Sequence, residues 1–206
     1  MTDPPFESAT GFRTEVKAPV QSYVDKMKTH ARNLEQTAIH ILLFGPGKSS
    51  NKHLQKRKQI QEHLRSLSPT NFVETGESIK ESVPELARAM DLQDMEELAV
   101  AEADLIFVLL ASEHQATGPE AEIQAYGKDR RTKAKTYIFL PNDWDKHGFL
   151  AQAVIDFPEE HKYWLSFSQI DECTMIRSYC EEKIREARGE KYMSRRRLDD
   201  LLRDVR

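Results

Sequence analysis

The residues of this chain that could carry out chemistry gather in two stretches, each of which follows a run of apolar residues. The first is HILLFGPGKSSNKH (residues 40–53), in which GPGKSS looks like the end of a phosphate-binding loop. A P-loop requires the pattern G-x-x-x-x-G-K-[ST], because its four intervening residues wrap a phosphate with backbone N–H groups. The first glycine of that pattern falls on Leu42, inside the apolar run. We therefore exclude a P-loop.

The glycine-rich turn itself still has two interpretations. Gly45, Pro46 and Gly47 lie where the apolar run gives way to a charged helical segment, at the carboxyl end of an expected strand. In an open α/β sheet ligands bind at this edge, and the helix N-termini there favour anions. Without a side chain at either glycine, a sugar or phosphate can approach the backbone closely. The alternative is a tight turn that needs glycine for its geometry alone.

The second stretch is LLASEHQATGPEAEIQAY (residues 109–126), and its acidic residues are candidates for catalysis. Acidic residues in the first turns of a helix complement the helix macrodipole, which is sufficient to explain Glu120. Glu122 differs, because Ile123 and Tyr126 lie on or near the packed side of the same helix. Glu122 can therefore point toward the carboxyl edge that also holds the Gly45 turn.

The loop before this helix supplies further candidates for binding a substrate. Ser112 and His114 follow the apolar run, and Gly118 precedes the helix. Each can contact a base or sugar at the carboxyl edge, and His114 can act as a general acid. A solvent-exposed histidine is the alternative for His114.

These candidates must be positioned by alternating strands and helices. Short apolar or alternating runs predict strands at residues 38–44, 71–75, 104–111, 135–141 and 162–168. Helical spacing of apolar residues predicts helices at 19–36, 51–67, 90–103, 119–127, 149–157 and 169–187. This order indicates a doubly wound α/β fold, with a parallel sheet of about five strands in flavodoxin-like order and helices on both faces.

The 206 residues fit one α/β domain at residues 38–188, extended at both ends. Residues 1–18 are polar and predict a loose arm, followed by an amphipathic helix with Pro19 in its first turn. That helix is expected to pack on its own domain or on another protein. Residues 189–206 are too charged to bury and predict an exposed helix or tail. Within the domain, Leu67 and Leu98 are expected to face inward.

The order of these motifs resembles the nucleoside 2-deoxyribosyltransferase family. The resemblance covers roughly residues 38–141, from LLFGPG at the end of the first strand, through AEADLIFVLLAS, to GPEAEIQAY at 118–126. It implies that Glu122 is the nucleophile. It also implies a second acid eight positions before Asp104, which is Glu96, with Asp94 as the fallback. The family often has an aromatic residue where this chain has Leu43, and this chain also departs from it at two positions, Gln124 and Tyr126.

The chemistry of an N-glycosidic bond explains why such a site needs two acids. Breaking this bond develops positive charge on the sugar C1′, which a carboxylate can stabilise or trap covalently. A second acid holds the ribose or protonates the departing base. The resemblance therefore implies cleavage of a nucleoside or nucleotide, with NAD among the candidates, in the manner of the N-glycosidases and the effectors of bacterial antiphage complexes. The alternatives are a nucleotide sensor without turnover and an interaction module like the TIR domains.

Composition limits the partners. The net charge of −4 supplies no global attraction to nucleic acid or to a membrane surface, and the apolar runs are too short to span a bilayer. We expect a cytoplasmic protein that binds a small nucleotide or nucleoside, with a protein partner or homo-oligomer as a further option. The basic clusters at residues 53–58, 128–135 and 194–197 indicate solvated faces, or indirect contact with nucleic acid through a partner.

Cysteine and histidine usage gives no sign of a metal site or a disulfide. Cys173 and Cys180 are seven residues apart on one expected helix, too far to bridge, and they indicate free thiols in a reducing compartment. The histidines are scattered, and none has ligand spacing with a cysteine. We expect neither a structural metal nor a cofactor.

Overall fold

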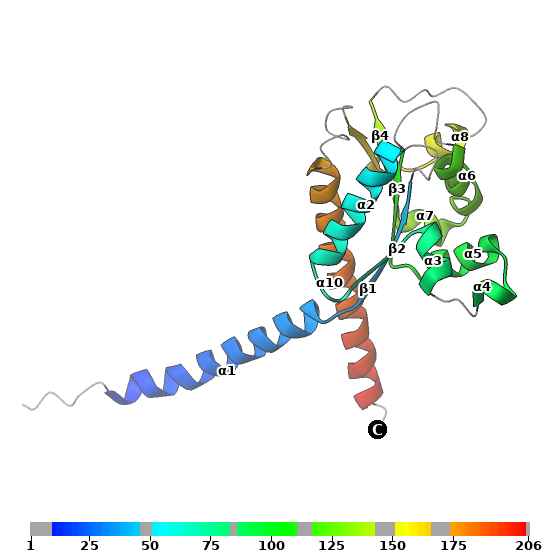
Figure 1. Ribbon diagram of the computed structural model, residues 1–206. Coiled ribbons are helices and arrows are strands. Elements are labelled where there is room, and N and C mark those ends of the chain that lie inside the picture. Colours follow the sequence, from blue (N-terminus) through cyan, green and yellow to red (C-terminus); the bar gives the residue numbers. More distant parts are fainter. Residues whose placement is uncertain are drawn as a thin grey trace, which may run out of the picture.

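A central parallel sheet organises the chain in the computed structural model, which describes residues 10–45, 51–82, 86–110, 117–142, 151–165 and 174–204 (Figure 1). The sheet has five strands in the order β2-β1-β3-β4-β5, and every neighbouring pair is parallel. This confirms the predicted doubly wound fold with flavodoxin-like strand order. The strands are β1 (Ile39–Phe44), β2 (Asn71–Glu74), β3 (Leu105–Leu109), β4 (Thr136–Pro141) and β5 (Lys162–Leu165).

Helices cover both faces of this sheet, and alternate strand residues form two separate cores. On one face, strand residues such as Leu43 and Phe107 pack with Ile60 of α2 (Asn51–Ser66) and Cys180 of α10 (Thr174–Asp204). The other face is covered by shorter elements. They are α3 (Gly76–Ser82), α4 (Leu86–Ala89), α5 (Leu92–Glu102), α6 (Thr117–Tyr126), α7 (Arg130–Ala134) and α8 (Ala151–Ile155). The 3-10 helix η1 (Glu159–His161) leads into β5, and its His161 ring stacks on Tyr137 of β4.

Polar side chains form hydrogen bonds with backbone groups at the edges of the sheet. At the amino edge, Asp104 Oδ2 accepts hydrogen bonds from the His40 N–H at 2.9 Å and from Lys191 Nζ at 2.5 Å. The pair with Lys191 ties α10 to the start of β3. On the edge strand β2, the carbonyl of Val73 accepts a hydrogen bond from Arg65 of α2 at 2.7 Å. These contacts satisfy backbone groups that an open sheet would otherwise leave to solvent.

Two helices are longer than the sequence predicts. Helix α1 (Thr10–Glu35) begins nine residues before Pro19, so the prediction of a loose arm is wrong for residues 10–18. Residues before the proline, such as Lys17 and Ala18, are strong helix formers, which explains the longer helix. Pro19 consequently lies in the helix interior, where it cannot donate to the preceding turn. Helix α10 runs without a break past residue 188 to Asp204.

Two predicted core positions are exposed. Leu67 follows the end of α2 and is 39% exposed, because Ile60 and Leu64 already fill the side of α2 that faces the sheet. Leu98 is 48% exposed, since the buried side of α5 is centred on Met95 and Val100. The short helices α3, α4 and α7 were not predicted either, because they are too short to show a period. Among the helices of the described ranges, none has the length and apolarity needed to cross a membrane.

Candidate active site at the carboxyl edge of the sheet

The Gly45 turn lies where β1 leaves the sheet, beside the end of β3. A Cβ atom on Gly45 would come within 3.1 Å of Arg57 Cδ and 3.3 Å of Leu109 Cβ. Arg57 is buried, and its Nη1 donates a hydrogen bond to the Gly45 carbonyl at 3.2 Å. Packing against α2 and β3 is therefore a reason for glycine at this position. Pro46 and Gly47 lie outside the described residues.

Glu96 is held at the same edge by α5. This helix begins with an N-cap, in which Asp91 accepts a hydrogen bond from the Asp94 N–H at 2.9 Å. Glu96 falls on the side of α5 that faces the core, and its carboxylate lies against the first residue of α3. A Cβ atom on Gly76 would be only 2.8 Å from Glu96 Oε1, so glycine leaves the room that this carboxylate occupies. Asp94 is exposed and is turned about 200° away from Glu96 around the helix.

Glu122 and Tyr126 lie one turn apart on α6 and share a side of that helix. Ile123 is buried in the core and fixes the rotation of the helix. The Tyr126 ring stacks on the ring of Phe44, the last residue of β1, with 5.9 Å between ring centroids and 10° between planes. Glu122 is half-buried, and its Oε2 atom is shielded from solvent. The α6 side chains are thereby brought to the end of β1.

Tyr126 links α6 to Glu96 of α5. Its hydroxyl donates a hydrogen bond to Glu96 Oε2 at 3.4 Å. Burial raises the pKa of Tyr126 well above its ordinary value of 10.0, and the negative charge of Glu96 and this hydrogen bond raise it further. The charges of Glu97 and Glu122 make smaller contributions in the same direction. The Tyr126 hydroxyl is therefore held as a hydrogen-bond donor to the carboxylate of Glu96.

Of the predicted set, the structure places Glu96 on α5 and Glu122 on α6, two helices joined by the Tyr126–Glu96 hydrogen bond, and it adds Tyr126, Phe44 and Gly76 to the site. The spacing of four residues between Glu122 and Tyr126 is the signal that could have identified the tyrosine. The aromatic ring at the end of β1 is that of Phe44, whereas Leu43, the position compared with the family, is buried on the opposite face of the sheet. Gly118 lies in the first turn of α6, while Ser112 and His114 lie outside the described residues.

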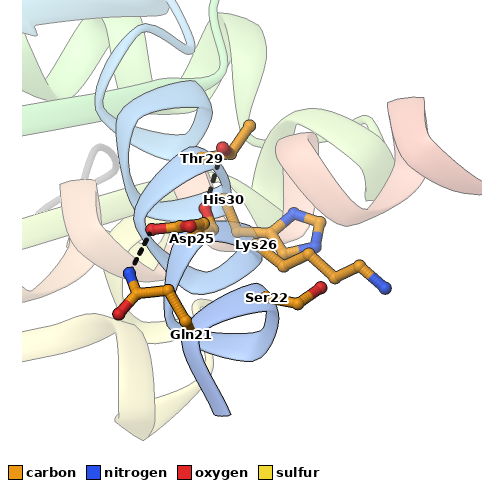
Figure 2. A pocket seen from close by; sticks show the side chains of 6 residues that line it. All are labelled: Gln21, Ser22, Asp25, Lys26, Thr29 and His30. Atoms are coloured by element: carbon orange, nitrogen blue, oxygen red, sulfur yellow. Dashed lines mark hydrogen bonds between the residues drawn. The ribbon is translucent and has the colours of Figure 1, made fainter. Parts of the chain in front are cut away.

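Gln124 faces away from the two acids, on the side of α6 toward α8. It lines a hollow of about 460 Å³ with residues of α7 and α8, such as Lys133 and Gln152. A second hollow, of about 670 Å³, lies on α1 and is lined by polar side chains from Gln21 to His30 (Figure 2). Helix α1 leads into the amino end of β1, so this hollow belongs to the opposite edge of the sheet. Neither hollow contains the predicted site residues.

A site for a metal ion is not found in the part of the chain that the structure describes, where no three His, Cys, Asp or Glu side chains come together. Cys180 is fully buried, and burial raises the pKa of its thiol, so it acts as a core residue. Cys173 lies outside the described residues. The chemistry available to the described site is that of two carboxylates and a phenol.

No protein-family model matches this chain, and no curated protein has a significantly similar sequence.

Proposed function

We propose that this chain cleaves the N-glycosidic bond of a nucleoside or nucleotide, with Glu122 as the nucleophile and Glu96 as the second acid. The observation that carries the proposal is the Tyr126 hydroxyl, which donates a hydrogen bond to Glu96 and lies one turn from Glu122 on α6. The two acids come from different helices, and the Tyr126 ring stacks on Phe44 at the end of β1. A pair of carboxylates at a ligand-binding edge is the arrangement that glycoside cleavage requires.

The proposed reaction has two steps. In the first, a Glu122 carboxylate oxygen bonds to C1′ as the bond between C1′ and the base nitrogen breaks, and the base leaves with a proton supplied by Glu96. In the second, water attacks C1′, the ester to Glu122 breaks, and Glu96 accepts a proton from the water. Tyr126 keeps the Glu96 carboxyl group oriented through its hydrogen bond.

The test is release of a free base from a panel of NAD, nucleosides and nucleoside monophosphates, measured by chromatography with the purified full chain. Glu122→Gln should lower the rate by about 10³-fold or more, because the amide cannot form the ester. Glu96→Gln should lower the rate by about 10²-fold or more, as expected for loss of a general acid.

Asp94→Asn is the matched control, because Asp94 is an exposed acid on the same helix as Glu96. It should leave the rate unchanged within a factor of about two, which corresponds to about 0.4 kcal/mol. An Asp94→Asn variant that loses activity while Glu96→Gln retains it would contradict the assignment of Glu96.

Calorimetric binding measurements on the same panel separate catalysis from sensing. If wild type and Glu122→Gln bind a nucleotide equally well and neither releases a base, the chain is a sensor and the catalytic proposal is wrong. Binding that is lost in Glu122→Gln together with base release in the wild type supports direct contact between Glu122 and the substrate.

A further inference from the structure

The start of helix α3 leaves an opening beside the carboxylate of Glu96. Gly76, the first residue of α3, follows the carboxyl end of β2. A Cβ atom built on it would lie 2.8 Å from Glu96 Oε1 and 3.8 Å from Glu96 Cδ. Leaving aside its own neighbours along the chain, Glu96 is the described residue that such an atom would meet within 4 Å. The acid of α5 therefore occupies the space that a side chain at position 76 would fill.

The backbone of α3 does not itself require glycine at this position. The φ angle of Gly76 is outside the positive range in which glycine is favoured over other residues. Glycine is also a poorer helix former than alanine, so it does not strengthen the first turn of α3. The contact with Glu96 is therefore the physical reason that the described residues give for a residue without a side chain here.

The start of α3 is held firmly in place. Thr75 and Ser78 cap the helix reciprocally: the Thr75 N–H donates to Ser78 Oγ at 2.7 Å, and the Ser78 N–H donates to Thr75 Oγ1 at 3.2 Å. Ile79, in the same helix, is buried in one core with Met95 of α5. A side chain added at position 76 would therefore displace the carboxylate of α5 rather than the backbone of α3.

The other oxygen of this carboxylate accepts the hydrogen bond from Tyr126. The distance from Glu96 Oε2 to the Tyr126 hydroxyl is 3.4 Å, already longer than the usual O–H···O distance of about 2.7–2.8 Å. An ordinary contact of 3.4 Å with a Cβ atom at position 76 would require Glu96 Oε1 to move by about 0.6 Å. Because a carboxylate is rigid and planar, Oε2 moves with Oε1. The hydrogen bond to Tyr126 would then be lost.

We propose that Gly76 is a positioning residue for Glu96, because its missing side chain lets one carboxylate oxygen lie at the start of α3 while the other faces Tyr126. The contact joins α3, α5 and α6 beside the carboxyl end of β2. Its consequence for catalysis rests on the proposed function, in which Glu96 is the second acid. Gly76 acts in that reaction through Glu96.

The test is the Gly76→Ala variant of the full chain, with the ionisation of Tyr126 as the readout. This ionisation is the difference between the absorbance titrations of a protein and of the same protein carrying Tyr126→Phe. Burial raises the pKa of Tyr126, and the charge and hydrogen bond of Glu96 raise it further, with smaller contributions from Glu97 and Glu122. Gly76→Ala should shift the ionisation to lower pH by about 1 unit, the size expected for loss of a hydrogen bond to a charged group.

The Glu96→Ala background separates positioning from a change in the burial of Tyr126. It removes the carboxylate, so Gly76→Ala should cause no further shift there. A shift of equal size in both backgrounds overturns the inference, and so does the absence of a shift when Glu96 is present. Gly189→Ala is the matched control, because it adds the same methyl group to α10 with no other atom within 4 Å, and it should leave the titration unchanged.

Thermal unfolding shows whether Gly76 is needed for packing instead. The atom displaced by the added methyl group is at the flexible end of a side chain, so Gly76→Ala should unfold within about 3 °C of the wild type. A Gly76→Ala variant that does not fold overturns the inference, because glycine would then be required by the packing of α3.

Base release from the nucleotide panel separates this inference from the proposed function. If the wild type releases a base, Gly76→Ala should lower the rate by about 10-fold or more, because Glu96 is displaced from its working position. An unchanged rate overturns the inference. If no protein releases a base but the titration shifts only when Glu96 is present, the proposed function is wrong and the positioning of Glu96 by Gly76 stands.

Discussion

Replacing Gly127 with alanine tests how tightly the end of α6 is packed, and therefore how Glu122 and Tyr126 are held. Gly127 is buried, and its N–H donates to the Ile123 carbonyl at 2.8 Å. A Cβ atom at this position would lie 2.5 Å from that carbonyl oxygen and 2.6 Å from Phe157 Cε2. Phe157 is itself buried in the core and cannot turn away into solvent.

The magnitude follows from these two contacts. Forcing a methyl group into a packed core costs about 1–3 kcal/mol. Moving away from the Ile123 carbonyl also weakens the hydrogen bond that ends the helix, which contributes about 0.5–1.5 kcal/mol. We expect Gly127→Ala to lower the free energy of unfolding by about 2–4 kcal/mol. For a domain of this size the Tm should fall by about 5–15 °C.

The assay is urea denaturation of wild type and variant, followed by circular dichroism. Gly189→Ala is the matched control, because it adds the same methyl group inside α10 at a position with no other atom within 4 Å. It should raise the free energy of unfolding by about 0.5–1 kcal/mol, since alanine is the better helix former. If Gly127→Ala is as stable as wild type, the packing of α6 described above is wrong.

Two further predictions concern charges. Asp104→Asn should lower the free energy of unfolding by about 1–2 kcal/mol in urea denaturation, because it removes the ion pair with Lys191. This loss should be smaller in high salt. The control Asp199→Asn, at an exposed position, should show no such loss. The native state holds the Tyr126 proton more tightly than the unfolded chain, so the stability that it contributes is complete below pH 10.0 and is lost as the pH rises through the raised pKa. The ionisation of Tyr126 is measured as the difference between the absorbance titrations of wild type and Tyr126→Phe, and it should occur above the ordinary range of a phenol. Glu96→Gln should shift this ionisation to lower pH. If Tyr126 ionises near pH 10.0 both in wild type and in Glu96→Gln, the contact with Glu96 is contradicted.

Much of the fold could be predicted from the sequence, because strand and helix periods are local properties. β3 is buried along its whole length, and its five apolar residues identify it without any knowledge of its neighbours. The predictions were wrong for helices whose ends are not marked by a local sequence pattern. Proline is favourable in the first turn of a helix, but α1 begins nine residues before Pro19, and α3 and α4 are too short for a period to be visible.

The candidate site could be predicted only in part. Glu122 was predicted from the motif at the start of its own helix, and Glu96 from its spacing to Asp104 in the family resemblance. Tyr126, Phe44 and Gly76 were missed as members of the site, because their importance lies in what they touch. Gly45, which was a candidate for ligand contact, is explained by the side chains of Arg57 and Leu109 against it. Neither the strand period nor the helix period carries information on the distance between residues that are far apart in the chain.

The sequence by itself determined the alternation of strands and helices, the parallel sheet, and the acids that follow its strands, since hydrophobic period and turn residues act over a few positions. Only the tertiary structure decided that Tyr126 of α6 donates a hydrogen bond to Glu96 of α5, and that the apolar side chains of Tyr23, Val24 and Met27 on α1 are left exposed. The physical reason is that burial and charge depend on which surfaces meet in three dimensions. Helical spacing identifies an apolar stripe, but it does not say what that stripe packs against.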